Sequence, residues 1–271
     1  MKISIIVPTY KPQAYLWECL DSIYNQTFPK ADYELVLVLN GCNEPYNTQI
    51  AEWLLNHDDL NVTYIQTNEG GVSNARNIAL DKAKGKHITF IDDDDYVSPQ
   101  YLERLYEKTT PDIISLCYPY AFNDGEPEKQ LAYPMTEVYE KCNTDKKYTL
   151  SSKAKKFLSG PCMKLIPMNF IQERRFDVRF KNGEDSLFMF LISDCMNYFK
   201  FADSSAVYFR RYRAGSALRR KKNTSEIILN TLRMIGVYNG IYIRHPFKYK
   251  FSFFITRVLG AIHGAIEQFK I

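Results

Sequence analysis

Apolar residues gather in short runs over the first 118 residues, and turn-forming or acidic residues end each run. Such runs predict buried β-strands. The expected strands are residues 3–7, 33–39, 62–66, 87–91 and 113–118. Between them, Leu16, Leu20 and Ile23 repeat at the spacing of one helix face, and residues 72–84 predict a helix that ends at Gly85. Strands that alternate with helices indicate an α/β domain with a mainly parallel central sheet flanked by helices.

The pattern changes beyond residue 118. Residues 119–150 are polar, rich in Pro and Tyr and without a clear period, and we interpret them as an insertion or a mobile connection. The later expected elements are a helix opened by Glu184 and Asp185, a strand at 207–212, and helices at 224–238 and 247–269.

Polar residues follow three of the expected strands where each one ends. Thr9 and Tyr10 follow the first strand, Asn40 follows the second, and Asp92–Asp95 follow the fourth. Open α/β sheets bind their ligands at the carboxyl ends of the strands. The three polar signals therefore predict a ligand site at this edge.

The four consecutive aspartates, Asp92–Asp95, carry the strongest chemical signal. Clustered carboxylates repel each other unless a cation neutralises them. Their hard oxygen atoms suit Mg²⁺ or Mn²⁺, which are often shared with substrate phosphates. A helix N-cap before Tyr96 is the plainer interpretation and accounts for one or two of the four. Four in a row exceed what capping needs.

Charge is distributed unevenly along the 271 residues. Residues 201–271 hold thirteen Lys or Arg against three Asp or Glu, whereas the first 200 hold 22 basic and 28 acidic residues. This asymmetry predicts an acidic catalytic half and a tail that meets an anionic partner. The six cysteines form no CxxC pair, and the first apolar run stops at Pro8. We therefore expect reduced thiols, no signal peptide and a cytoplasmic location.

Five segments together resemble the family-two glycosyltransferases with the GT-A fold. Asp92 and Asp94 match the paired positions of that family's DxD motif, and Glu184-Asp185 matches its later Glu-Asp motif. The segments are Ser4–Tyr10, Asn68–Asn77, Phe90–Asp95, Gly183–Phe188 and Tyr208–Ser216, in the family's order. The resemblance implies a nucleotide-sugar-binding half at 1–118, an acceptor-binding and catalytic-base part at 119–216, and a basic helical C-terminal extension at 217–271.

The resemblance also implies an enzyme that transfers a sugar from a nucleotide diphosphate sugar to an acceptor hydroxyl, with inversion, in surface glycan or polysaccharide synthesis. Pro8 and Tyr10 are expected to line the nucleotide base pocket. Arg76 is expected to reach the nucleotide or its phosphates, because a guanidinium suits an anionic donor. Lys164 is a further candidate to approach these phosphates. Taken alone, Arg76 would be interpreted as an exposed helix charge.

The resemblance implies a separate role for each acidic residue of the site. Asp92 and Asp93 are expected to lie against the ribose and the diphosphate, and Asp94 to ligate Mn²⁺ or Mg²⁺. Asp185 is expected to be the general base that deprotonates the acceptor, a glycan or a lipid-linked glycan. Glu184-Asp185 alone would indicate only a helix cap.

One departure from the family pattern concerns Asn40. The family usually has an acidic residue followed by Gly-Ser after its second strand, whereas this chain has Asn40, Gly41 and Cys42. An amide hydrogen-bonds a base edge but lacks the carboxylate charge. The expectation that the donor nucleotide is UDP therefore rests on the family resemblance and not on these residues.

Two other functions fit parts of the sequence. A nucleotidyltransferase also combines an α/β sheet with acidic metal ligands, but it usually has a Gly-rich basic loop where this chain has Pro8–Pro12. A degenerate module that binds a sugar nucleotide or glycan without turnover is the second alternative. The intact aspartate cluster, Arg76 and Asp185 argue against it.

The C-terminal extension supports two interpretations. Arg219–Lys222 are four consecutive basic residues, and the basic residues beyond them are interleaved with aromatic ones: Arg244, Lys248, Lys250 and Arg257 with Tyr242, Phe247, Tyr249, Phe251, Phe253 and Phe254. One interpretation is an interfacial helix on the anionic inner face of the membrane. The other is packing of the aromatic residues onto the catalytic domain or across a homodimer interface. No nucleic-acid motif is present, so nucleic acid is not an expected partner.

Overall fold

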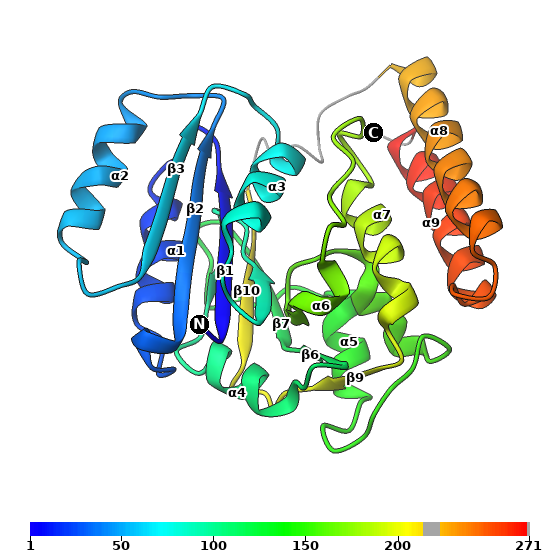
Figure 1. Ribbon diagram of the computed structural model, residues 1–271, viewed down its shortest axis with the longest axis horizontal. Coiled ribbons are helices and arrows are strands. Elements are labelled where there is room, and N and C mark those ends of the chain that lie inside the picture. Colours follow the sequence, from blue (N-terminus) through cyan, green and yellow to red (C-terminus); the bar gives the residue numbers. More distant parts are fainter. Residues whose placement is uncertain (214–222, 270–271) are drawn as a thin grey trace.

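The computed structural model describes residues 1–213 and 223–269 (Figure 1). The strands are β1 (Ile3–Thr9), β2 (Tyr33–Asn40), β3 (Val62–Thr67), β4 (His87–Phe90), β5 (Tyr96–Val97), β6 (Ile113–Leu116), β7 (Tyr118–Asn123), β8 (Lys164–Pro167), β9 (Tyr198–Phe201) and β10 (Val207–Tyr212). A seven-stranded sheet has the order β3-β2-β1-β4-β8-β6-β9, and a smaller sheet has the order β5-β10-β7. In the larger sheet only β8 runs antiparallel to its neighbours, which confirms the predicted mainly parallel α/β architecture.

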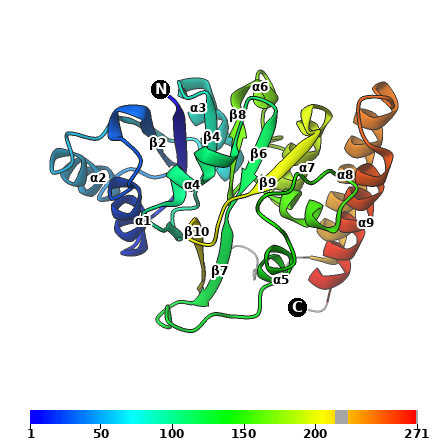
Figure 2. The ribbon, with the colours of Figure 1, turned by 90° about the horizontal axis from the view of Figure 1, so that it is seen from below.

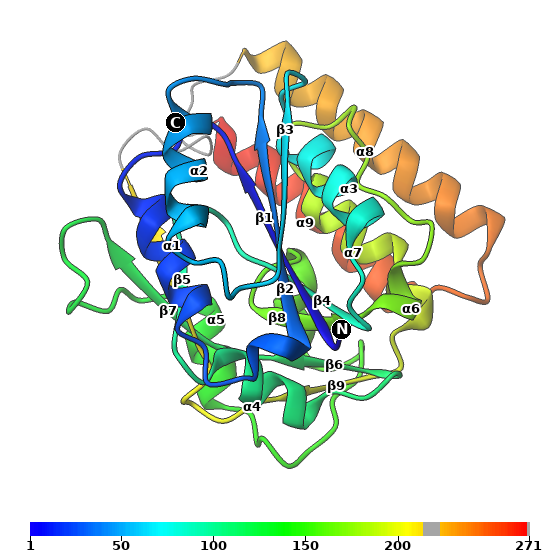
Figure 3. The same cartoon turned by 60° about the vertical axis from the view of Figure 1, so that its left-hand side comes forward.

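Helices cover both faces of the large sheet. They are α1 (Tyr15–Tyr24), α2 (Tyr46–Leu55), α3 (Val72–Lys82), α4 (Tyr101–Lys108), α5 (Pro134–Glu140), α6 (Met168–Ile171), α7 (Glu184–Leu191), α8 (Thr224–Arg244) and α9 (Phe251–Gln268). Short 3₁₀ helices lie at Lys30–Asp32, Lys153–Ser159 and Ser193–Cys195. Figure 3 shows α1 and α2 on one side of β1 and β2 and α3 on the other side.

Burial on both faces explains the unbroken apolar sequence of β1 and β2. Successive residues of a strand point to opposite faces. Ile6 and Val36 join a core cluster that includes residues of α3 and α7, whereas Ile5 and Leu35 join a second cluster with residues of α1. Each fully buried aliphatic side chain contributes about 1.5–3 kcal/mol. The two clusters therefore fix the sheet between its helices.

The strand register brings separate chain segments to one edge of the sheet. Ile6 pairs with Phe90 across β1 and β4, and Thr9 pairs with Leu39 across β1 and β2. The chain therefore leaves β4 beside the end of β1, and β2 ends next to it. This is the edge at which the sequence predicted a ligand site.

Residues 119–150 contain regular structure that their sequence pattern did not predict. Strand β7 continues to Asn123 and pairs in parallel with β10, a partner more than eighty positions later in the chain. Helix α5 follows, and the hydroxyl of Thr136 donates to the carbonyl of Pro119 at 2.7 Å. Strand β8 was also missed. It has four residues and begins with a lysine, so its sequence lacks the apolar pattern of a buried strand.

Helices α8 and α9 form a pair that packs on α7 at the side of the molecule (Figure 2). Phe253 is fully buried, and Tyr249 and Phe254 are nearly so. All three lie around the ring of Phe190 on α7, and the hydroxyl of Tyr249 donates to the carbonyl of Leu191 at 3.1 Å. These aromatic residues are therefore part of the domain core.

The rest of the helix pair keeps apolar residues in contact with solvent. Phe247 is fully exposed, and Ile243 and Phe251 are 74% and 59% exposed. Arg257 departs from the basic surface that the sequence indicated, because it is buried over the ring of Phe253 and donates to the hydroxyl of Ser186 at 3.2 Å. The basic run Arg219–Lys222 lies outside the described residues. In the part of the chain that is described, no helix has the length and hydropathy to cross a bilayer.

Candidate active site

Arg76 lies at the centre of the predicted site. Its guanidinium donates to Asp185 at 2.6 Å and to Asp92 at 2.8 Å, and its side chain is only 3% exposed. The ring of Phe176 covers it at 5.3 Å. A buried guanidinium needs ion-pair partners, because an unpaired charge is costly away from water. Arg76 therefore holds the end of β4 and the start of α7 in one arrangement.

The two carboxylates of α7 differ in their environments. Burial raises the pKa of Asp185, and the charge of Arg76 acts in the opposite direction. Burial raises the pKa of Glu184 to about 7, with Asp185 adding to the effect, and one Glu184 oxygen is buried without a hydrogen-bond partner among the described residues. Asp185 keeps 36% of its side chain exposed, whereas Glu184 is 8% exposed. Asp185 is therefore the more accessible of the two carboxylates.

The aspartate cluster Asp92–Asp95 is held by different partners. Thr9 donates its hydroxyl to Asp93 at 2.5 Å. Asp94 pairs with Arg213 at 2.6 Å, and Asp95 accepts from the backbone N–H of Arg211 at 2.8 Å. Burial raises the pKa of Asp93 to about 7, and the neighbouring carboxylates add to this while Thr9 opposes it. The neighbouring cations thus leave part of the repulsion among these carboxylates uncompensated.

Arg211 and Arg213 were not singled out from the sequence as partners of the cluster. Both belong to the segment Tyr208–Ser216 that resembles the family, and this resemblance was the available signal. Arg213 also lies 4.5 Å over the ring of Tyr15. The last three residues of that segment, 214–216, are outside the described part of the chain.

Asn40 joins the loops at the end of β1 and before α3. Its amide donates to the carbonyl of Thr9 at 2.7 Å, and its oxygen accepts from the N–H of Gly71 at 2.8 Å. Next to it, Gly41 has φ +65° and approaches Gly70 so closely that a Cβ would lie 2.8 Å from the Gly70 Cα. A residue with a side chain would be strained here. Contact between Asn40 and a nucleotide base stays a prediction.

Two further donor-site predictions lie at the end of β1. Pro8 is buried within the strand, and Tyr10 is 52% exposed just beyond it. The Tyr10 ring faces Gly41. An exposed aromatic ring beside a glycine turn offers a flat surface on which a planar base can stack.

A cavity of about 100 Å³ opens beside Asp92 and Asp185. Lys164 lines it, fully buried, and donates its ammonium to the carbonyls of Gly160 and Cys162. Burial lowers the pKa of Lys164 to about 8. Lys164 thus shapes the cavity wall, and its use of both carbonyls favours a positioning role over a direct contact with phosphate.

Tyr133 and Arg210 line the same cavity and were not among the predicted site residues. The guanidinium of Arg210 donates to the Tyr133 hydroxyl at 2.8 Å. Tyr133 lies just before α5, in the segment whose sequence had no clear period. No sequence signal identified it, because its place depends on packing against β10.

Helix α8 contacts the first turn of α7, which carries Asp185. The side chain of Met234 lies over Gly183, where a Cβ would come within 2.4 Å of it. Tyr238 donates its hydroxyl to Ser186 at 3.1 Å. Gly183 has φ +84°, so this turn depends on glycine both for its backbone and for its packing. The C-terminal helices therefore fix the position of Asp185.

The acidic residues fit a divalent cation shared with a ligand. Among the residues that the structure describes, no three His, Cys, Asp or Glu side chains form a complete protein-only metal site. Mg²⁺ commonly takes one or two carboxylates, with phosphate oxygens and water completing the shell. Asp92 and Asp94 supply oxygens of this kind, and a cation would relieve the repulsion among the carboxylates of the cluster.

The α/β fold gathers acidic side chains at the carboxyl edge of its sheet, where open α/β folds bind their ligands. The model of glycosyl transferase family 2 matches residues 4–173, more than half of the chain. The protein belongs to this family, which confirms the resemblance found in the sequence. Asp185 lies beyond the matched residues.

Comparison with individual proteins agrees with this assignment. Poly(ribitol-phosphate) β-N-acetylglucosaminyltransferase TarS of Staphylococcus aureus is 29% identical over 240 residues, which cover 88% of this chain and 40% of TarS. This chain therefore spans less than half the length of that relative.

Two solved structures have the same fold. The structure of S. aureus TarS 1–349 with UDP-GlcNAc has a TM-score of 0.75, 22% identity, and coverage of 98% of this chain and 73% of that one. A mannosyltransferase of Pyrobaculum calidifontis, solved with GDP-Man and Mn²⁺, has a TM-score of 0.62 and 17% identity over the same shares of the two chains. These likenesses establish the GT-A type of fold.

Proposed function

We propose that the protein transfers a sugar from a nucleotide diphosphate sugar to a hydroxyl of a surface glycan or lipid-linked acceptor. The observation that carries the proposal is the network in which Arg76 joins Asp92, at the end of β4, to Asp185, at the start of α7. It places a partly exposed carboxylate next to the acidic cluster and a cavity. The relative with UDP-GlcNAc bound supports a UDP-sugar donor.

The donor would lie along the edge formed by β1, β2 and β4. Tyr10 offers its ring to the base, Asn40 keeps the loops around the base in place, and Asp93 lies near the end of β1 for the ribose or diphosphate. Asp94 would hold Mn²⁺ or Mg²⁺, with Asp92 beside it against the ribose or diphosphate, and the cation would neutralise charge on the departing diphosphate when bound. The Mn²⁺-bound structural relative supports this assignment.

Asp185 is the proposed general base. It would take the proton from the acceptor hydroxyl as the acceptor oxygen bonds to the anomeric carbon and the bond to the diphosphate breaks. Arg76 favours the ionised form of Asp185 for this step, because its positive charge opposes the rise in pKa that burial causes. Asp185 is the only accessible carboxylate of its motif, because Glu184 is buried, and a single accessible base supports inversion at the anomeric carbon.

The exposed side of α8 and α9 supports peripheral contact with a membrane. Phe247 and Ile243 project into solvent, and Arg244, Lys248 and Lys250 lie close to them in the chain. Each basic residue near an anionic surface contributes about 1 kcal/mol. Such contact would bring the enzyme to an acceptor carried on a lipid.

Asp185→Asn tests the general base. Asparagine keeps an oxygen that accepts from Arg76 but does not take a proton, so turnover should fall roughly 10²–10⁴-fold while donor binding by calorimetry stays near wild type. Turnover is measured as nucleoside diphosphate released with acceptor present. Asp58→Asn, an exposed change, is the matched control. If Asp185→Asn keeps most activity and Glu184→Gln does not, Glu184 is the base.

Chelation tests the metal. EDTA should abolish transfer and weaken donor binding, and Mn²⁺ or Mg²⁺ should restore both. Asp94→Asn should lower donor affinity with little effect on the melting temperature, because relief of repulsion among the carboxylates offsets the weaker contact with Arg213. Transfer at full rate in EDTA would rule out the metal role.

Vesicle co-sedimentation tests the exposed side of the C-terminal helices. The protein should bind anionic vesicles, and binding should fall with salt. Phe247→Ala should weaken binding without changing stability, because this side chain is fully exposed. Phe253→Ala should lower stability by about 3–5 kcal/mol, because it empties a core position. A protein that ignores anionic vesicles at low salt would contradict the membrane proposal.

A further inference from the structure

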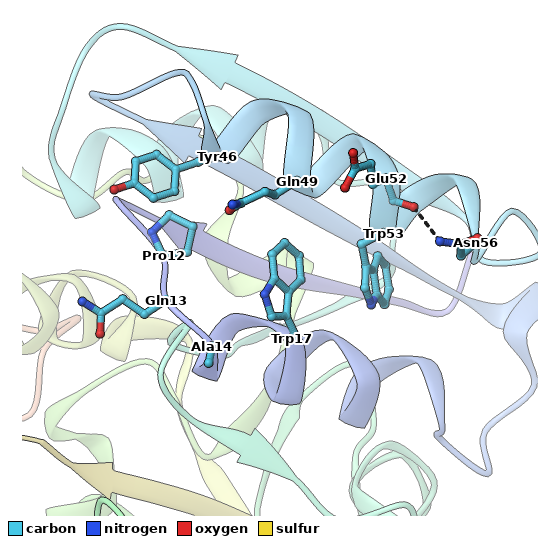
Figure 4. A pocket seen from close by; sticks show the side chains of 9 residues that line it. All are labelled: Pro12, Gln13, Ala14, Trp17, Tyr46, Gln49, Glu52, Trp53 and Asn56. Carbon is cyan, nitrogen blue, oxygen red and sulfur yellow. Dashed lines mark hydrogen bonds between the residues drawn. The ribbon is translucent and has the colours of Figure 1, made fainter.

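A groove of about 550 Å³ lies between α1 and α2 (Figure 4). It shares no lining residue with the cavity beside Asp185. Pro12 and Tyr46 lie at one end, where the loop from β1 leads into α1. Because Tyr10 is only two residues before Pro12, the groove begins next to the donor edge and runs away from it.

The only two tryptophans of the chain, Trp17 and Trp53, both line this groove. Figure 4 shows Trp17 rising from α1 and Trp53 reaching down from α2. The Trp53 indole N–H donates to Asp21 at 2.9 Å, and its ring stacks on His57 with centroids 3.9 Å apart. Trp53 is therefore a fixed wall. Trp17 is half-buried, and its indole N–H has no partner among the described residues.

Polar side chains without a hydrogen-bond partner among the described residues lie beside the two indole rings. Gln13, Gln49 and Glu52 line the groove and are exposed, and none of them hydrogen-bonds through its side chain to another described residue. Figure 4 shows the Gln49 amide directed over the groove. Aromatic faces beside free amide and carboxylate groups suit a sugar, whose C–H face packs on a ring while its hydroxyls form hydrogen bonds.

The charge of the groove lining indicates which kind of glycan the groove can bind. Its lining contains one carboxylate, Glu52, and no lysine or arginine. A chain of phosphates or sulfates would meet repulsion and no counter-charge. A neutral glycan would meet the half-buried rings of Trp17 and Tyr46 and the hydrogen-bonding groups of the groove lining.

We propose that the groove between α1 and α2 binds a neutral segment of a glycan, outside the site of transfer. This inference rests on the proposed function, because a glycan groove serves an enzyme that acts on a glycan. Helix α7, which carries Asp185, lies on the other side of the sheet strands from α1 and α2 (Figure 1). The groove would therefore retain a distal part of a glycan chain while another part reacts.

Tryptophan fluorescence tests the groove directly, because both tryptophans line it. The probes are glucose and N-acetylglucosamine tetrasaccharides, with a sulfated tetrasaccharide for comparison. A neutral tetrasaccharide should give a saturable change in emission, and the sulfated one should bind at least tenfold more weakly. No response to either neutral tetrasaccharide, or tighter binding of the sulfated one, would overturn the inference.

Variants locate the binding. Trp17→Ala should weaken binding of the neutral tetrasaccharide by about tenfold or more, measured by calorimetry, whereas Trp17→Phe should retain most of it. Leu55→Ala, an exposed change on α2 outside the groove lining, is the matched control. Equal binding by Trp17→Ala and wild type would contradict the assignment.

UDP binding is measured in the same variants. It should be unchanged in all of them, because none lies in the donor site. If a variant loses tetrasaccharide binding but still binds UDP, the loss is specific to the groove. If the wild-type protein does not bind UDP, that result contradicts the proposed function and not the glycan groove.

Discussion

The buried guanidinium of Arg76 is the constraint on which the site depends. It comes from α3 and pairs with carboxylates from two other segments, Asp92 after β4 and Asp185 on α7. Removing one partner of a buried ion pair typically costs about 3–5 kcal/mol. The cost is lower here, because both carboxylates are partly exposed to water. The three elements therefore keep one relative position. The cavity and the acidic edge follow from that position.

The supports around this network come from distant parts of the chain. The sheet register places Thr9 beside Asp93, and Asn40 joins the end of β1 to the loop before α3. On the other side, Met234 and Tyr238 of α8 hold the first turn of α7. The C-terminal helices thus have a structural purpose beyond any surface contact, because they hold the turn of α7 that carries Asp185, the partner of Arg76.

Much of this arrangement could be predicted from sequence, for a physical reason. Buried parallel strands such as β1 and β2 need continuous apolar runs, and their ends must meet at one edge. The convergence of Asp92 with the end of β1 followed from that rule. The pairing of Arg76 with Asp185 did not, because it joins residues 109 positions apart through tertiary packing.

The features that escaped prediction also depend on tertiary contacts. Strand β8 begins with Lys164, whose ammonium is satisfied by two backbone carbonyls that no periodicity reveals. The sequence placed Arg257 among solvent-facing basic residues, yet it is buried over the ring of Phe253. Composition indicates how many charges a segment carries but not which of them face water.

The pH dependence of kcat/KM tests the role of Arg76 most directly, because it reports the ionisation of the free enzyme. Arg76 opposes the rise in the pKa of Asp185, and a general base acts only when deprotonated. Replacing Arg76 by Gln should therefore raise the pKa of Asp185 and move the acidic limb of the profile to higher pH. Arg76→Lys, which keeps the charge, should leave the limb closer to wild type. A folded Arg76→Gln variant with an unchanged acidic limb would contradict the account.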